Sequence, residues 1–206
     1  MSLVKYKSKR NFKATPEPGA IKKTATKKLS FVVQRHKASR LHYDLRLEMD
    51  GVLKSWAVPK GPSLNPSDKR LAMMVEDHPY EYKNFSGIIP EGNYGAGIVE
   101  IWDSGTYTAL KISADENKSD ENLLLAALKT GSLKFILSGK KLKGEFALVK
   151  LKNNQAGDKA WLLIKHNDQY AMDTYDSETE TEKDSPINKW LEANKKISKK
   201  KAFPVR

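Results

Sequence analysis

Residues 41–58 constrain the fold more than any other part of the chain. Between positions 41 and 49, apolar and polar side chains alternate, which is the period of a strand with one buried face. The Asp-Gly pair at 50–51 is typical of a tight hairpin turn, and residues 52–58 supply a returning strand. The sequence therefore predicts an antiparallel hairpin that places His42, Asp44 and Arg46 together on its polar face.

Further strands are predicted at intervals along the chain. They are Ser30–Gln34, Leu71–Asp77, Gly97–Trp102, Ser132–Leu137, Glu145–Lys150 and Trp161–Lys165. The loops PKGPSLNPSD and IIPEGNYGAG are too rich in glycine, proline and other turn residues to form helices. Many short strands with few helices indicate a mainly β fold, with a closed or sandwiched antiparallel sheet.

Two helices are predicted. The first runs from about Ser119 to Lys129, because acidic residues begin it, apolar residues recur at helical spacing and Gly131 follows its end. The second begins at Ser185, with Pro186 in the first turn, and continues to about residue 197. The stretch YDSETETEKDS before it is polar and acidic, so residues 176–206 are predicted to be a polar linker followed by a basic helix and tail.

Positive charge is concentrated at the N-terminus. Residues 1–28 carry nine Lys or Arg and one Glu, which gives +8 of the total net charge of +12. Prolines and the absence of sustained periodicity predict that this basic arm is extended or lies over a body formed by residues 29–175. A basic arm on a nearly neutral body favours binding to a polyanion, and the alternative is a solubilising tail.

The composition limits the class of protein. A chain of 206 residues is long enough for one well-formed core, and a second independent core is not expected. It contains no cysteine, so disulfides and thiolate zinc sites are excluded and any metal must be held by histidine and carboxylate. No signal peptide or membrane-spanning run is apparent, and we expect a cytoplasmic protein.

His36, His42 and Asp44 are candidate metal ligands. His36 lies six positions before His42, so it reaches the same face if the strand persists or if a short loop returns it. Two imidazoles and one carboxylate suit Mn, Fe or Zn and leave coordination positions open for water or substrate. A polar strand face exposed to solvent would show the same alternation, so the pattern leaves both interpretations open.

Other polar residues could act on a phosphate ester beside such a metal. Arg46 shares the face, Lys60 and Arg70 lie in or near a loop that could cover it, and His78 could donate a hydrogen bond or proton. Each could equally be a solvated or structural residue, and Glu76 could either orient a ligand or be exposed. His166 has no carboxylate nearby in the sequence and is not assigned to the site.

The chain resembles a known family. Residues 31–107, from FVVQRHKASRLHYDLRLEMDG to IIPEGNYGAGIVEIWDSGTY, together with WLLIKH at 161–166 and KRNFKATPEP in the arm, resemble the 3′-phosphoesterase domain of bacterial DNA ligase D. That domain also occurs as stand-alone proteins in bacteria and archaea. The resemblance covers roughly residues 3–175.

The resemblance implies a compact antiparallel β-barrel enzyme with one or two short helices. Members use Mn²⁺ or a similar divalent metal to repair DNA 3′ ends: they remove a terminal ribonucleoside and then the remaining 3′-phosphate, leaving a 3′-hydroxyl. The metal ligands would be His36, His42 and Asp44. Around the scissile phosphate would lie Arg46, Lys60, Arg70, His78 and Tyr82, supported by Gln34 and Glu76, with Arg10 and Glu17 of the arm serving the phosphodiesterase step.

One residue departs from the family pattern. Asn11 stands where the family usually has aspartate, and an amide cannot act as a base, so the departure weakens the case for ribonucleoside removal more than for phosphate removal. The chain shows no polymerase or ligase domain, so we expect a separate protein that meets any ligase non-covalently. We also expect this protein to be a monomer. Two alternatives remain: a DNA-end-binding module without catalysis, and a general metal-dependent nuclease.

Overall fold

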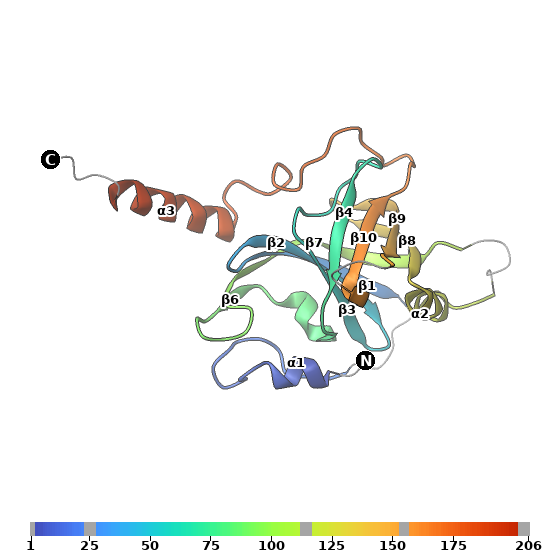
Figure 1. The fold of residues 1–206 in the computed structure, drawn as a ribbon, viewed down its shortest axis with the longest axis horizontal. Helices are drawn as coiled ribbons and strands as arrows, with labels where there is room; N and C mark the ends of the chain where they lie inside the picture. Colours follow the sequence, from blue (N-terminus) through green and yellow to red (C-terminus); the bar gives the residue numbers. More distant parts are fainter. Residues whose placement is uncertain (1–2, 23–27, 112–116, 153–156, 202–206) are drawn as a thin grey trace.

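A computed structural model describes residues 3–22, 28–111, 117–152 and 157–201. Eight of its strands pair edge to edge around a closed ring (Figure 1). In chain order they are β1 Leu29–Lys37, β2 Leu41–Met49, β3 Val52–Val58, β4 Lys69–Met74, β7 Gly97–Ala109, β8 Ser132–Gly139, β9 Lys143–Lys150 and β10 Ala160–Lys165.

The ring runs β1-β2-β3-β4-β10-β9-β8-β7, and β7 closes it by pairing with β1. Every pairing is antiparallel, so the predicted mainly β barrel is confirmed. Two short strands lie outside the ring: β5 His78–Pro79 pairs with β3, and β6 Gly87–Ile89 pairs with β7. We expected residues 88–97 to form only loop, and β6 is a short exception at their start.

The long strand β7 can close the barrel because glycines let its backbone come very close to that of β8 at one point. Gly105 pairs with both Phe31 of β1 and Gly139 of β8. A Cβ at Gly105 would lie 2.1 Å from the Ser138 carbonyl oxygen, and one at Gly139 would lie 2.4 Å from the Asp103 carboxylate. No larger residue fits there, so glycine at both positions permits the tight closure.

The predicted hairpin and strands are present, but two strands are longer than expected. Asp50 and Gly51 adopt φ of 54° and 69°, the left-handed pair that a tight primed turn requires. β1 continues to Lys37 and β7 to Ala109, whereas we predicted ends at positions 34 and 102. β4 instead ends at Met74, before the predicted end at Asp77.

The described residues contain three α-helices: α1 Val4–Ser8, α2 Asp120–Thr130 and α3 Pro186–Lys201. α2 confirms the prediction, with the Ser119 hydroxyl accepting a hydrogen bond from the Asn122 amide and Gly131 at φ 82° ending the helix. Two 3₁₀ turns, η1 Tyr80–Asn84 and η3 Gly157–Lys159, complete the elements. None of the described helices has the length and hydrophobicity needed to cross a bilayer.

The arm is more structured than we predicted, and it covers the outside of the barrel. It contains α1, whose Tyr6 is fully buried in a second hydrophobic cluster with residues of η1, β3, β6 and β7. Because this cluster and the arm lie against the outer face, the polar side chains of Asp44, Arg46 and Glu48 in β2 are buried as well as the apolar ones, and His42 is partly buried. The expectation of a half-buried β2 was therefore wrong, since the period of alternation does not show what packs on the polar face.

The segment after β10 is also packed against the body, although its polar composition predicted a linker. Arg35, fully buried at one end of the barrel, forms ion pairs with Glu100 of β7 at 2.9 Å and Glu178 at 2.6 Å. The indole N–H of Trp102 donates to the Thr181 hydroxyl at 2.9 Å. The chain then enters α3, which extends away from the barrel beyond its first turn (Figure 1).

Replacing Ile187 with alanine tests this docking. Ile187 is fully buried at the start of α3, so we expect a loss of about 2 kcal/mol in the free energy of unfolding, measured by urea denaturation followed by tryptophan fluorescence. Trp190, which is 41% exposed on the same helix, provides the control substitution Trp190→Ala. Equal and small effects of both changes would show that the segment does not stabilise the barrel.

Candidate metal centre and active site

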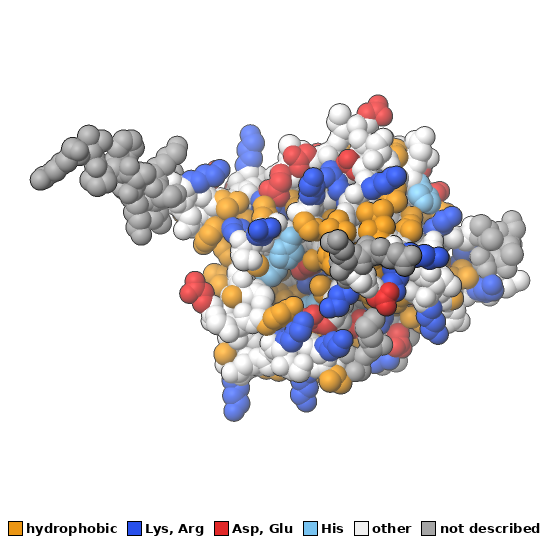
Figure 2. Space-filling view, viewed as in Figure 1, with side chains coloured by type: hydrophobic (Ala, Val, Ile, Leu, Met, Phe, Trp, Pro, Cys, Tyr) orange, Lys and Arg blue, Asp and Glu red, His pale blue; other side chains and the backbone are white. Residues whose placement is uncertain are grey.

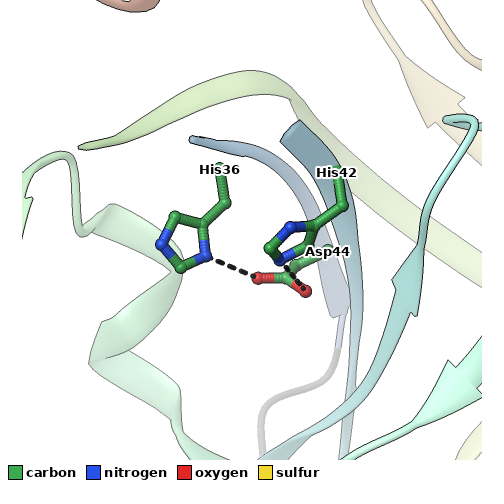
Figure 3. Close-up of side chains that lie close together, drawn as sticks. All are labelled: His36, His42 and Asp44. Carbon is green, nitrogen blue, oxygen red and sulfur yellow. Dashed lines mark ion pairs between the residues drawn. The ribbon is translucent and has the colours of Figure 1, made fainter. Parts of the chain in front are cut away.

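His36, His42 and Asp44 converge on one point of the outer barrel surface. His36 of β1 pairs directly with His42 of β2, because a loop at 38–40 returns the chain, and Asp44 follows two residues along β2. Both imidazole rings turn toward the Asp44 carboxylate (Figure 3), with His36 Nδ1 at 3.8 Å and His42 Nε2 at 3.7 Å. The three possible ligand atoms lie within 4.8 Å of one another.

Backbone carbonyls orient both rings. His36 Nε2 lies 2.9 Å from the Gly95 carbonyl oxygen, and His42 Nδ1 lies 3.0 Å from that of Arg40. A carbonyl can only accept a hydrogen bond, so each of these nitrogens carries a hydrogen. The other nitrogen of each ring faces the Asp44 carboxylate and is the atom that could bind a cation. Such outer contacts are typical of histidines that bind metals, so the donor set fits a divalent cation.

The carboxylate of Asp44 is held in its ionised form. Burial acts to raise its pKa, but the Arg46 guanidinium and the two histidine rings lower it more strongly, so the pKa lies well below the usual range. Arg46 Nη2 donates to Asp44 Oδ2 at 2.9 Å, while Oδ1 faces His42. The carboxylate can therefore contact a cation and still keep its bond to Arg46.

Arg46 connects the three ligands to the rest of the site. Its Nε donates to Gln34 Oε1 at 2.6 Å, and its guanidinium lies 4.8 Å from the centre of the Tyr82 ring. Gln34 is itself fixed, because its amide donates to the carbonyls of Tyr82 and Phe85. The side chain of Arg46 is 3% exposed, so its orientation is determined by packing rather than by solvent.

His78 lies between two guanidinium groups. Arg46 Nη1 is 3.0 Å from Nδ1, and Arg10 Nη2 is 3.3 Å from Nε2. Burial of the ring and the charges of Arg46 and Arg10 hold the pKa of His78 well below the usual value for histidine. The Glu76 carbonyl, 2.9 Å from Nδ1, accepts a hydrogen bond and so favours the tautomer with a hydrogen on Nδ1. Arg46 donates toward the same atom and so favours the tautomer with the hydrogen on Nε2, which means that each ring nitrogen can offer either an N–H or a lone pair.

The arm supplies Arg10 to this site. Arg10 donates to Glu17 at 2.9 Å and to Glu76 at 3.3 Å, and its guanidinium stacks 3.8 Å from the centre of the Tyr6 ring. Burial raises the pKa of Tyr82, and the Glu17 carboxylate adds to this effect, although the charge of Arg46 acts in the opposite direction. The Tyr82 hydroxyl therefore stays protonated and donates a hydrogen bond to Glu17 at 2.8 Å. Glu76 thus anchors the arm and does not contact the candidate metal ligands.

These residues line one cavity of about 470 Å³. Of the residues singled out from the sequence, those that line it are Arg10, His36, His42, Asp44, Arg46, Glu76, His78 and Tyr82. The volume is in the range of small-molecule sites, which is sufficient for a terminal phosphate with part of its nucleoside. Gln34 and Glu17 lie behind this lining and contact its residues.

Three of the expected site residues lie elsewhere. Lys60 is exposed after β3, and Arg70 of β4 forms an ion pair with Asp68 at 2.8 Å; neither lines the cavity. Asn11 is exposed, and its side chain accepts a hydrogen bond from the Lys13 amide at 3.2 Å. The structure therefore brings the β2 face, His78 and Arg10 together, and leaves Lys60, Arg70 and Asn11 outside the cavity. His166 lies outside as well, and it contacts Glu145 at 3.1 Å.

Sequence reasoning missed several contributors. Tyr94 and Gly95 line the cavity from the glycine-rich loop, and Tyr6 supports Arg10 from α1. The glycines of NYGAG predicted a loop, but only the folded chain shows that the Gly95 carbonyl orients His36. Every residue has a backbone carbonyl, so the amino-acid sequence does not show which carbonyl will contact a histidine ring.

Comparison with known proteins identifies relatives. A family model described as the DNA Ligase D 3′-phosphoesterase domain matches residues 34–150. The Multifunctional non-homologous end joining protein LigD of Pseudomonas aeruginosa is 47% identical over 178 residues, which cover 84% of this chain and 20% of that protein. The protein of the same name from Mycolicibacterium smegmatis is 44% identical over 172 residues, which cover 81% of this chain and 21% of that protein. The chain thus spans about one fifth of the length of these relatives.

The lowered pKa of His78 predicts a dependence of stability on pH. The unfolded chain binds this proton near pH 6.5 and the folded chain does not, so stability should fall as the pH drops below about 6.5, by up to about 1.4 kcal/mol per pH unit. The variant His78→Gln cannot titrate, so the decrease in its Tm from about pH 7 to 5 should be smaller than in the wild type. With His166→Gln as the control, equal slopes in all three proteins would contradict the assignment.

Proposed function

Because the chain belongs to the DNA ligase D 3′-phosphoesterase domain family, we propose that it is a metal-dependent phosphoesterase that processes the 3′ ends of DNA during repair of breaks. The observation that supports this most is the convergence, in one cavity, of the two histidines and aspartate of the β1–β2 face with Arg46, Arg10 and His78. A metal alone would suit many reactions. Two guanidiniums beside it suit a substrate with a doubly charged phosphoryl group.

The proposed substrate is a DNA 3′ end that carries a phosphate or a terminal ribonucleoside, and the product is a 3′-hydroxyl. The cavity favours an end rather than an internal site, because Arg10 of the arm, Tyr82 of η1 and residues 94–96 form walls beside the metal ligands. We further propose that the protein acts beside a DNA ligase in end joining, since the relatives are named as multifunctional end-joining proteins.

The proposed cofactor is Mn²⁺ or a similar divalent cation, held by His36, His42 and Asp44. When bound, such a cation supplies Lewis-acid stabilisation to a phosphoryl oxygen and lowers the pKa of water. The mixed nitrogen and oxygen donors accept Mn²⁺, and the Arg40 and Gly95 carbonyls already hold both imidazoles with their free nitrogens facing the carboxylate.

The surrounding side chains define how a phosphate would be held. Arg46 and Arg10 lie on either side of His78, so together they place two positive charges where negative charge increases in the transition state. Burial and the two guanidiniums lower the pKa of His78 and favour its neutral form, in which the ring can donate a hydrogen bond from its single N–H. Tyr82 and Gln34 hold Arg46 in place by contacts that exclude water.

Replacing His42 with alanine tests the metal assignment. His42 is the most exposed of the three ligands, with 23% of its side chain accessible, so its removal should leave the barrel folded. We expect Mn²⁺ affinity, measured by isothermal titration calorimetry, to fall by at least about tenfold, and release of phosphate from a 3′-phosphate end to fall by at least about a hundredfold. His166→Ala is the control, and an active His42→Ala enzyme would refute the assignment.

A comparison of two duplexes tests the substrate assignment. With Mn²⁺, the protein should convert to a 3′-hydroxyl both a primer-template that ends in a 3′-phosphate and one that ends in a single 3′ ribonucleotide, as followed on sequencing gels. Asn11 lies outside the cavity, so Asn11→Asp should change the ratio of the two rates by less than about threefold. Cutting of a circular DNA would indicate a general nuclease, and no reaction would indicate a binding module.

A further inference from the structure

A second and larger groove lies beside the active-site cavity. It has a volume of about 1090 Å³ and lies between α1, β4, α2 and β10. Apolar side chains form much of its wall: Met73, Met74, Leu125, Leu128 and Trp161. Figure 2 shows hydrophobic side chains gathered over β4 and β10, two of the strands that border the groove, with Lys and Arg side chains nearby.

Lysines surround the apolar wall. Six lysines and three carboxylates line the groove, and each of the carboxylates is already paired with a cation: Asp50 with Lys22, Glu76 with Lys9 and Asp158 with Lys150. Lys5, Lys129 and Lys159 are exposed, and the described residues give none of them an ion pair. The groove therefore presents unneutralised positive charge above an apolar surface.

The groove adjoins the active-site cavity. Val75, Glu76 and Tyr94 line both spaces, so a strand whose end lies in the cavity would pass these residues to reach the groove. Tyr94 is 50% exposed at this junction, and the Lys9 ammonium lies 4.2 Å from the centre of its ring. An exposed aromatic ring beside a cation is the arrangement on which unpaired bases stack while the neighbouring phosphate is neutralised.

We propose that this groove binds unpaired nucleotides of the DNA strand whose 3′ end lies in the active-site cavity; at a primer-template end, the terminal base pairs would have to open first. The inference rests on the proposed function, because that function places the 3′ end beside Tyr94. Bases and sugars would lie on the apolar wall and phosphates would face the lysine rim. A paired duplex has its bases inside and offers only phosphates and groove edges to a surface, so the apolar wall favours a separated strand.

The variant Lys129→Ala/Lys159→Ala tests the groove without altering the active-site cavity, since neither lysine lines that cavity. The control is Lys134→Ala/Lys143→Ala, which removes the same charge from exposed positions of β8 and β9 outside both spaces. Binding is measured by fluorescence anisotropy with a 5′-fluorescein oligothymidylate that ends in a 3′-hydroxyl, in EDTA, so the readout does not require activity.

The groove variant should bind this strand about tenfold more weakly than the wild type, and the slope of log affinity against log salt should decrease by about 1.4, as for two lost phosphate contacts. The control should remain within about twofold of the wild type. The wild type should also show a lower KM for a long than for a dinucleotide 3′-phosphate substrate, and the groove variant should lose that difference while it keeps kcat.

The combined results distinguish a failure of the groove inference from a failure of the proposed function. If DNA ends are processed but the groove variant behaves like the control, or if both pairs weaken binding equally, the groove inference is wrong and the phosphoesterase assignment stands. If no DNA end is processed but only the groove variant loses affinity, the groove is a nucleic-acid site and the proposed function fails.

Discussion

The site depends on the register between β1 and β2. Because His36 pairs with His42, and Asp44 follows on the same face, three possible ligands meet without any further rearrangement of the chain. A shift of one residue in this pairing would turn the β2 ligands into the barrel and separate them from His36. The closed barrel prevents such a shift, since β1 is held by β7 on its other edge and the apolar face of β2 fills the core.

The polar face is kept buried by balancing its charges. Arg46, Arg10 and Lys9 neutralise Asp44, Glu17 and Glu76, and all six groups make hydrogen bonds. A buried charge without a partner would be costly, so the arm is needed both to cover the face and to supply cations. The arm is therefore part of the candidate site as well as a source of positive charge, and its helix α1 stacks Tyr6 beneath Arg10.

The sequence predicted the barrel strands, α2 and the convergence of His36, His42 and Asp44, because each depends on local patterns: alternation, an Asp-Gly turn, helix caps and the spacing of like residues. It did not predict the cover of the β2 face or the docking of residues 177–187, since both depend on contacts between distant segments. Arg35 shows the difference. Its position in β1 was close to expectation, but its partner Glu178 lies 143 residues away in a stretch whose polar composition indicated a linker.

The central claim is that the β1–β2 face holds a divalent cation. X-ray diffraction from crystals grown with Mn²⁺, recorded near the manganese absorption edge, locates that ion directly by its anomalous scattering. We predict one strong peak between His36 Nδ1, His42 Nε2 and the Asp44 carboxylate. A structure in which these three side chains are ordered, with no anomalous peak among them, would contradict the account.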